Sequence, residues 1–172
     1  MKRKILIPGG AAVIAAVVAV FLLATGGSAT NALPHVAPGA AVGVKQTALG
    51  KTLVDANGRT LYLFGADTPN RSTLSQAGLA VWPAFTSMGA PKAASGAAST
   101  LIGTTAGPAG GRQVTYNGHP LYYFVGDRGP GSVSGQRLNQ FGAVWYVLSP
   151  NGNAVTRAAS SPATSSLPAY GY

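Results

Sequence analysis

The sequence of 172 residues contains no cysteine, no glutamate and only three aspartates. The absence of cysteine excludes a disulfide framework and every thiolate metal site. With only two histidines, a zinc, copper or haem centre lacks the ligands that it needs. Calcium prefers about six to eight oxygen ligands, several of them carboxylates, and this chain has few to offer. We therefore expect neither a metal nor a cofactor.

Negative charge is therefore scarce, and the chain is basic. Twelve Lys and Arg residues face three Asp residues, for a formal net charge of +9, or +6 once Lys2, Arg3 and Lys4 are set aside. The remaining cations are dispersed, without the clustering typical of nucleic-acid binding, so no nucleic-acid partner is expected. A basic surface attracts anionic envelope polymers or a membrane surface. The alternative is that the charge serves solubility alone.

The N-terminus predicts export. The charged residues 2–4 precede an apolar run whose uninterrupted part extends from Ala11 to Ala24. This part is shorter than the about 20 residues of a membrane-spanning helix, which favours a signal peptide within residues 1–32. An uncleaved N-terminal membrane anchor is the alternative. In both cases the remainder is extracytoplasmic, either secreted or held at the membrane.

One block of sequence occurs twice. Residues 57–67 and 117–127 align without a gap and share Asn-Gly, then Leu-Tyr-x-Phe, then an Asp. A second shared element, Ala-Val-Trp, follows at residues 80–82 and 143–145 and accounts for both tryptophans of the chain. Self-similarity of this kind indicates a tandem duplication of one supersecondary unit.

Each copy predicts a β-hairpin. Asn57-Gly58 and Asn117-Gly118 stand between apolar runs, the arrangement typical of a type I′ turn. On the outgoing strand the two-residue period places Tyr and Phe of the motif on one face. The other face has Leu61 and Leu63 in the first copy and Leu121, Tyr123 and Val125 in the second. Because both faces are apolar, we expect these strands to be covered on both sides.

The duplicated Tyr-x-Phe-x-x-Asp pattern resembles the bacterial secreted-repeat family of predicted lipoproteins. That family is defined by a repeated Tyr-x-aromatic-x-x-Asp motif, and no molecular function is assigned to it. Residues 113–122 and 141–147 resemble its second repeat, and Trp82-Pro83 resembles the end of its first. Many members carry a lipid-modified Cys and a Cys pair ahead of the Trp-Pro. This chain has neither, so the resemblance implies no lipid anchor and no disulfide here.

The fold class that we predict is mainly β, with two tandem β-hairpin repeats packed as one antiparallel β domain and little helix. Short helices are expected within residues 71–80, capped by Ser72 or Thr73, and within 135–140. Strands are expected at 44–47, 52–56, 60–65, 100–105, 112–116, 121–125 and 144–149, with a third hairpin-like turn at Asn151-Gly152. The predicted divisions are signal peptide or anchor 1–32, stem 33–41, repeat 1 42–85, linker 86–99, repeat 2 100–156 and disordered tail 157–172.

The motif aspartates Asp67 and Asp127 allow two interpretations. In the first they are structural: each carboxylate closes a turn, accepts the O–H of Tyr62 or Tyr122, or pairs with a neighbouring arginine. In the second they meet as a carboxylate dyad for hydrolysis, which requires environments that separate their pKa values. His119, the only His of the folded part, is expected at a hairpin exit as a surface or turn residue.

No nucleophile elbow or phosphate loop is present, so no catalytic residue is assigned. We expect an exported, non-catalytic module that binds a ligand or an envelope component, with a hydrolase based on the dyad as the alternative. The candidate binding residues are those of the two motifs and the adjacent histidine: Tyr62, Phe64, Asp67, Tyr122, Phe124, Asp127 and His119.

Overall fold

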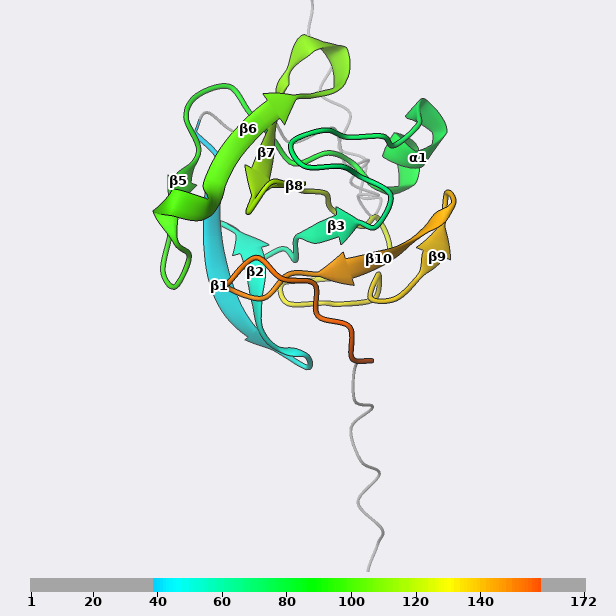
Figure 1. Cartoon of the computed structure of the whole chain (residues 1–172). Coiled ribbons are helices and arrows are strands. Elements are labelled where there is room, and N and C mark those ends of the chain that lie inside the picture. The colour runs from blue at the N-terminus through cyan, green and yellow to red at the C-terminus, as the bar shows by residue number, and fades with distance from the viewer. Residues whose placement is uncertain (1–38, 159–172) are drawn as a thin grey trace, which may run out of the picture. The chain divides into compact units, whose positions relative to one another are not determined.

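Strands dominate the computed structural model, which describes residues 39–158 (Figure 1). This confirms the mainly β prediction, and the described residues all fall within one compact unit. The predicted signal peptide or anchor, most of the stem and most of the tail lie outside the described residues. The elements in order are β1 (Ala41–Thr47), β2 (Gly50–Asp55), β3 (Tyr62–Phe64), α1 (Gln76–Val81), β4 (Thr86–Ser87), β5 (Lys92–Ala93), η1 (Ser99–Leu101), β6 (Ile102–Ala106), η2 (Pro108–Gly110), β7 (Arg112–Tyr116), β8 (His119–Pro120), β9 (Asn139–Gln140) and β10 (Ala143–Val147).

The residues that the structure describes form three small sheets. Their strand orders are β2-β1-β5, β3-β10-β9 and β4-β7-β6, with β8 added to β7. All pairs are antiparallel except β1 with β5, which is parallel. The pairing of β3 with β10 joins the two repeats, since it sets Phe64 opposite Trp145. The repeats therefore share a sheet.

The two Asn-Gly turns differ. In the second copy Asn117 and Gly118 have φ of 49° and 79° and link Tyr116 to His119, which confirms the type I′ prediction. In the first copy only Gly58 has positive φ, so the type I′ prediction is wrong there. The reason is Asp55, whose carboxylate oxygen Oδ1 accepts hydrogen bonds from two backbone N–H groups of this turn and stabilises a longer loop.

The segments after the turns leave their hairpins and meet each other. The backbone N–H of Tyr62 donates to the carbonyl of Tyr122 at 2.9 Å, and the reverse hydrogen bond is 3.0 Å. The predicted strand at 121–125 is consequently wrong as a regular element: only isolated bridges form at Tyr122. From the Leu121 carbonyl onward, the other edge of this segment is taken by residues 83–85 and not by its own hairpin partner, since the Tyr123 N–H donates to the Pro83 carbonyl and the Phe85 N–H to the Leu121 carbonyl, both at 2.8 Å.

These crossing segments separate two hydrophobic clusters. Tyr62, Phe64 and Tyr122 belong to one cluster, together with both tryptophans. Leu61, Leu63, Leu121 and Tyr123 belong to the other. Burial on both faces is thus confirmed, as the alternation of the motif predicted.

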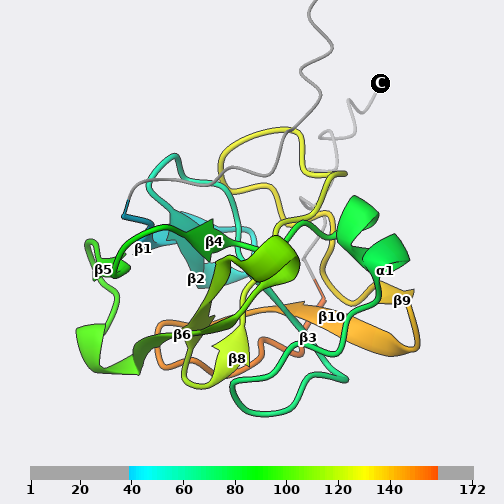
Figure 2. The same ribbon diagram turned by 90° about the horizontal axis from the view of Figure 1, so that it is seen from above.

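Helix is confined to short stretches, and its positions differ from the prediction. Helix α1 begins later than expected, because the Ser75 hydroxyl, not Ser72 or Thr73, accepts from the Gly78 N–H at 3.2 Å and caps it. The helix expected at 135–140 is wrong: Arg137 has a φ of 60°, and β9 follows. Figure 2 shows α1 beside β9, at the end of the β3-β10-β9 sheet.

The segment between the repeats packs against both of them. Strand β4 pairs with β7, and Thr86 and Ser87 are buried. Strand β5 adds to β1 in parallel.

The predicted hairpin-like turn at Asn151-Gly152 is confirmed by the hydrogen bond from the Ser149 N–H to the Asn153 carbonyl, 2.9 Å long.

Candidate functional site

The two motifs exchange their hydrogen bonds. The Tyr62 hydroxyl donates to Oδ2 of Asp127 at 2.9 Å, and the Tyr122 hydroxyl donates to Oδ2 of Asp67 at 2.7 Å. Each Tyr-x-Phe-x-x-Asp motif therefore supplies a tyrosine to the aspartate of the other repeat. This confirms the predicted Tyr-to-Asp hydrogen bond and shows that it crosses between the repeats. We call this arrangement the crossed pairs.

The second oxygen of each carboxylate closes the loop that follows it. Oδ1 of Asp67 accepts the backbone N–H of Thr73 at 2.7 Å, and Oδ1 of Asp127 accepts that of Ser134 at 2.9 Å. The loops are thereby tied to the inter-repeat contact. Both aspartates accept backbone N–H groups ahead of them, as predicted, but six and seven residues on, so each closes a loop and not the turn that was predicted.

Four aromatic rings stack between the crossed pairs. The indoles of Trp82 and Trp145 lie 3.8 Å apart and are inclined by 5°. Each also stacks on a motif phenylalanine of the other repeat, Trp82 on Phe124 at 4.4 Å and Trp145 on Phe64 at 4.5 Å. Three of these rings are buried and Phe124 is partly buried, and their stacking contributes both apolar area and orientation. We call these four residues the aromatic stack.

One glutamine serves both indoles. The Trp82 Nε1–H donates to the Gln140 side-chain oxygen at 2.9 Å, and the Trp145 Nε1–H donates to the Gln140 backbone carbonyl at 3.2 Å. A buried indole N–H needs an acceptor, and Gln140 satisfies the two of them together. This requirement accounts for the extended conformation of β9, where the end of a helix was predicted.

Burial sets the electrostatics of the crossed pairs. It raises the pKa of both Asp67 and Asp127 above the ordinary carboxyl value, although the hydrogen bonds to each carboxylate act in the opposite direction. Burial, together with the charge of Asp127, raises the pKa of Tyr62 far above 10. Burial, together with the hydrogen bond to Asp67 and its charge, does the same to the pKa of Tyr122. Both tyrosines therefore stay neutral donors at physiological pH.

His119 is half-buried in β8, directly after the type I′ turn, as expected for a residue at a hairpin exit. Burial lowers its pKa, and the negative charge of Asp67 opposes this shift. Tyr62 and Tyr122 are fully buried, whereas both motif aspartates are half-buried. Ligand binding by the motifs remains a prediction, and it would have to use the half-buried side chains.

The partners that the sequence did not reveal are hydroxyl and amide groups of the loops. The Ser72 hydroxyl donates to the Tyr122 hydroxyl at 2.7 Å, since the single Tyr122 proton is directed to Asp67, and the Gly135 N–H donates to the Tyr62 hydroxyl at 3.3 Å. One signal was available: a hydroxyl residue, Thr73 or Ser134, stands six or seven positions after each motif aspartate. Nothing in the sequence marked Gln140.

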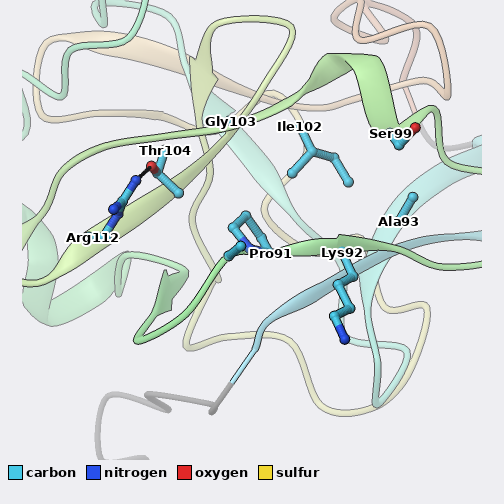
Figure 3. A pocket seen from close by; sticks show the side chains of 9 residues that line it. Pro91, Lys92, Ala93, Ser99, Ile102, Gly103, Thr104 and Arg112 are labelled. Atoms are coloured by element: carbon cyan, nitrogen blue, oxygen red, sulfur yellow. Dashed lines mark hydrogen bonds between the residues drawn. The ribbon is translucent and has the colours of Figure 1, made fainter.

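A groove lies outside the crossed pairs. It has a volume of about 540 Å³ and lies between the segment around β5 and the face of β6 (Figure 3). Two of its lining residues are cationic, Lys92 and Arg112, and none is acidic.

Within residues 39–158 no group of three or more His, Asp or Glu side chains is placed to hold a metal ion. In the same part of the chain, no helix has the length and apolarity to cross a membrane.

These features define a tandem β-repeat protein whose halves are joined by exchanged side chains. A family model described as "Secreted repeat of unknown function" matches residues 43–86 and 103–149, more than half of the chain. The matched segments correspond to the two motif-bearing halves, and the chain belongs to this family. No curated protein and no solved structure matches it.

Proposed function

We propose that this protein is an exported, non-catalytic β-repeat module that binds anionic components of the bacterial cell envelope through its basic surface. The family is one of secreted repeats, which places the chain outside the cytoplasm. The charged and apolar N-terminal segment supports export by a signal peptide or by an anchor that stays in the membrane.

One observation carries the proposal: every carboxylate side chain is used internally. Asp55 accepts the Tyr123 hydroxyl at 2.9 Å and two backbone N–H groups, and the other two aspartates form the crossed pairs. Among the described residues, all hydrogen bonds to carboxylates come from hydroxyl and backbone N–H groups. None of these hydrogen bonds to the aspartates comes from a Lys or Arg side chain. The positive charge of the described Lys and Arg residues is therefore available to an external anion.

The crossed pairs favour a structural over a catalytic role for the motif. No hydrogen bond joins Asp67 to Asp127, since the hydrogen-bonding partners of each are a tyrosine and loop groups. Tyr62 and Tyr122, with their pKa raised by burial, are poor general bases. The hydrolase alternative stays a prediction without a supporting contact.

The test uses the native protein isolated from its cell envelope. Intact mass shows whether the N-terminal segment is retained, and the co-purified material identifies the bound component. Chromatography on an immobilised polyanion, with an uncharged matrix as the control, then measures binding against ionic strength. We expect retention that is strong at low salt and lost as salt screens the charges. Equal passage through both matrices at low salt would overturn the proposal.

A further inference from the structure

The groove beside β6 has a defined floor. Strand β6 is the last strand of the β4-β7-β6 sheet, and its register with β7 sets Ala106 opposite Arg112 and Thr104 opposite Val114. Directly opposed residues share a face, so Ile102, Thr104 and Arg112 project from the same side of the sheet. The groove is therefore built on regular structure.

The facing wall comes from the segment before and within β5. Its position is fixed by the parallel pairing of β5 with β1, where Lys92 is opposite Ala41. The Lys92 N–H donates to the Ala40 carbonyl at 2.8 Å and the Ala94 N–H to the Val42 carbonyl at 2.7 Å. Cationic groups are thus placed on both sides of the groove by backbone pairing.

The Arg112 guanidinium is held against β6 by a side-chain hydrogen bond. One terminal nitrogen of its guanidinium donates to the Thr104 hydroxyl, as Figure 3 shows. This contact leaves other N–H donors of the planar group for a ligand. The Lys92 side chain extends from the opposite wall and away from Ile102. Its flexible stem allows the ammonium to reach a ligand that lies along the rim.

The remaining lining is apolar and small. Pro91 and Ile102 lie between the two ends of the groove, and Ala93 and Ser99 lie at the end away from Arg112 (Figure 3). The volume, about 540 Å³, is within the range of about 300–1,000 Å³ typical of small-molecule sites. Such a surface suits the carbon skeleton between charged groups of a ligand.

We propose that this groove binds phosphate groups of the envelope ligand, an inference that rests on the proposed function. Arginine matches phosphate oxygens in a bidentate manner, and lysine adds a point charge. The apolar centre contacts the carbon atoms that link successive phosphates. Phosphate occurs both in soluble phosphodiester polymers and in lipid headgroups, and the experiment distinguishes these sources.

The experiment compares two double variants of the full chain with equal net charge. Lys92→Gln/Arg112→Gln removes the groove cations, and Arg71→Gln/Arg128→Gln removes two exposed cations elsewhere. Binding is measured by calorimetry with sodium polyphosphate and with polyglutamate, and by co-sedimentation with phosphatidylglycerol and with phosphatidylcholine vesicles. We expect the groove variant to bind the phosphate probe at least about tenfold more weakly, and the control within about threefold of the wild type.

Ser99→Asp is a further variant, which keeps both groove cations and places a negative charge at the rim. It should weaken phosphate binding in the same direction, and circular dichroism checks that each variant is folded. Binding of polyphosphate indicates a soluble polymer, whereas binding of phosphatidylglycerol vesicles alone indicates headgroups. Equal losses in the two double variants, or equal affinity for polyglutamate, would overturn the groove assignment. A wild-type chain that binds none of the anionic probes would overturn the proposed function itself.

Discussion

Alkaline pH should unfold this protein through three buried tyrosines. Tyr62, Tyr122 and Tyr123 are 0%, 0% and 2% exposed, and each donates its hydroxyl to an aspartate. Burial, reinforced by these carboxylates, raises the pKa of all three well above the ordinary value of 10.0. For Tyr123 the cation Arg59, 3.9 Å from the ring centroid, opposes the shift.

Proton linkage fixes the sign and the size of the change in the free energy of unfolding with pH. Because the folded-state pKa is raised, the stabilisation is complete below pH about 10 and is lost as pH rises toward the folded-state pKa. Above pH about 10 the unfolded chain has released three tyrosyl protons that the folded chain retains. The free energy of unfolding should then fall by about 4 kcal/mol per pH unit, since one proton corresponds to about 1.4 kcal/mol. Two such pH units remove about 8 kcal/mol, which is enough to unfold a domain in the lower half of the usual stability range of about 5–15 kcal/mol.

The assay is urea denaturation followed by circular dichroism at a series of pH values, together with ultraviolet absorbance of tyrosinate. We expect the tyrosinate signal of these three residues to appear only with unfolding. Tyr123→Phe should reduce the slope by about one proton. Titration of all tyrosines near pH about 10 in a chain that remains folded would refute the reasoning.

Three further perturbations have defined outcomes. Phe141 has a φ of 57° at an exposed hairpin tip, so Phe141→Gly should raise the urea midpoint, by about 1 kcal/mol in unfolding free energy. A Cβ at Gly135 would meet Trp82 Cη2 at 2.6 Å, and Gly135→Ala should cost about 1–3 kcal/mol in the same assay, whereas Gly129→Ala meets open space and should cost far less. Because burial lowers the pKa of His119, its contribution to stability is present above pH about 6.5 and is lost as pH falls through the folded-state pKa. His119→Gln should therefore flatten the fall of stability between pH about 7 and about 5, and an unchanged fall would show that other groups cause it.

Sequence reasoning recovered what depends on local pattern. The repeat, the two-sided burial around Tyr62 and Tyr122, and the type I′ turn at Asn117-Gly118 all follow from side-chain periodicity and turn chemistry. The first turn escaped prediction because the Asp55 carboxylate competes for its backbone N–H groups. That competition depends on a single residue that the second copy lacks.

The crossing of the motifs could not be predicted in the same way. Tyr62 precedes Asp67 by five residues and Asp127 by many more. Because both repeats contain the same Tyr and Asp, the sequence fits a hydrogen bond within one repeat as well as a hydrogen bond between the two repeats. The choice is made by tertiary geometry, once β3 pairs with β10. The groove was hidden for a similar reason, because Lys92 and Arg112 are brought together by strands of different sheets.

The central claim is that each motif tyrosine bonds the aspartate of the other repeat, and double-mutant cycles test it most directly. One cycle combines Tyr62→Phe with Asp127→Ala, and the other combines Tyr62→Phe with Asp67→Ala, each read by urea denaturation. The account predicts a coupling free energy of about 1–3 kcal/mol in the first cycle and within about 0.5 kcal/mol of zero in the second. Coupling in the second cycle with none in the first would contradict it.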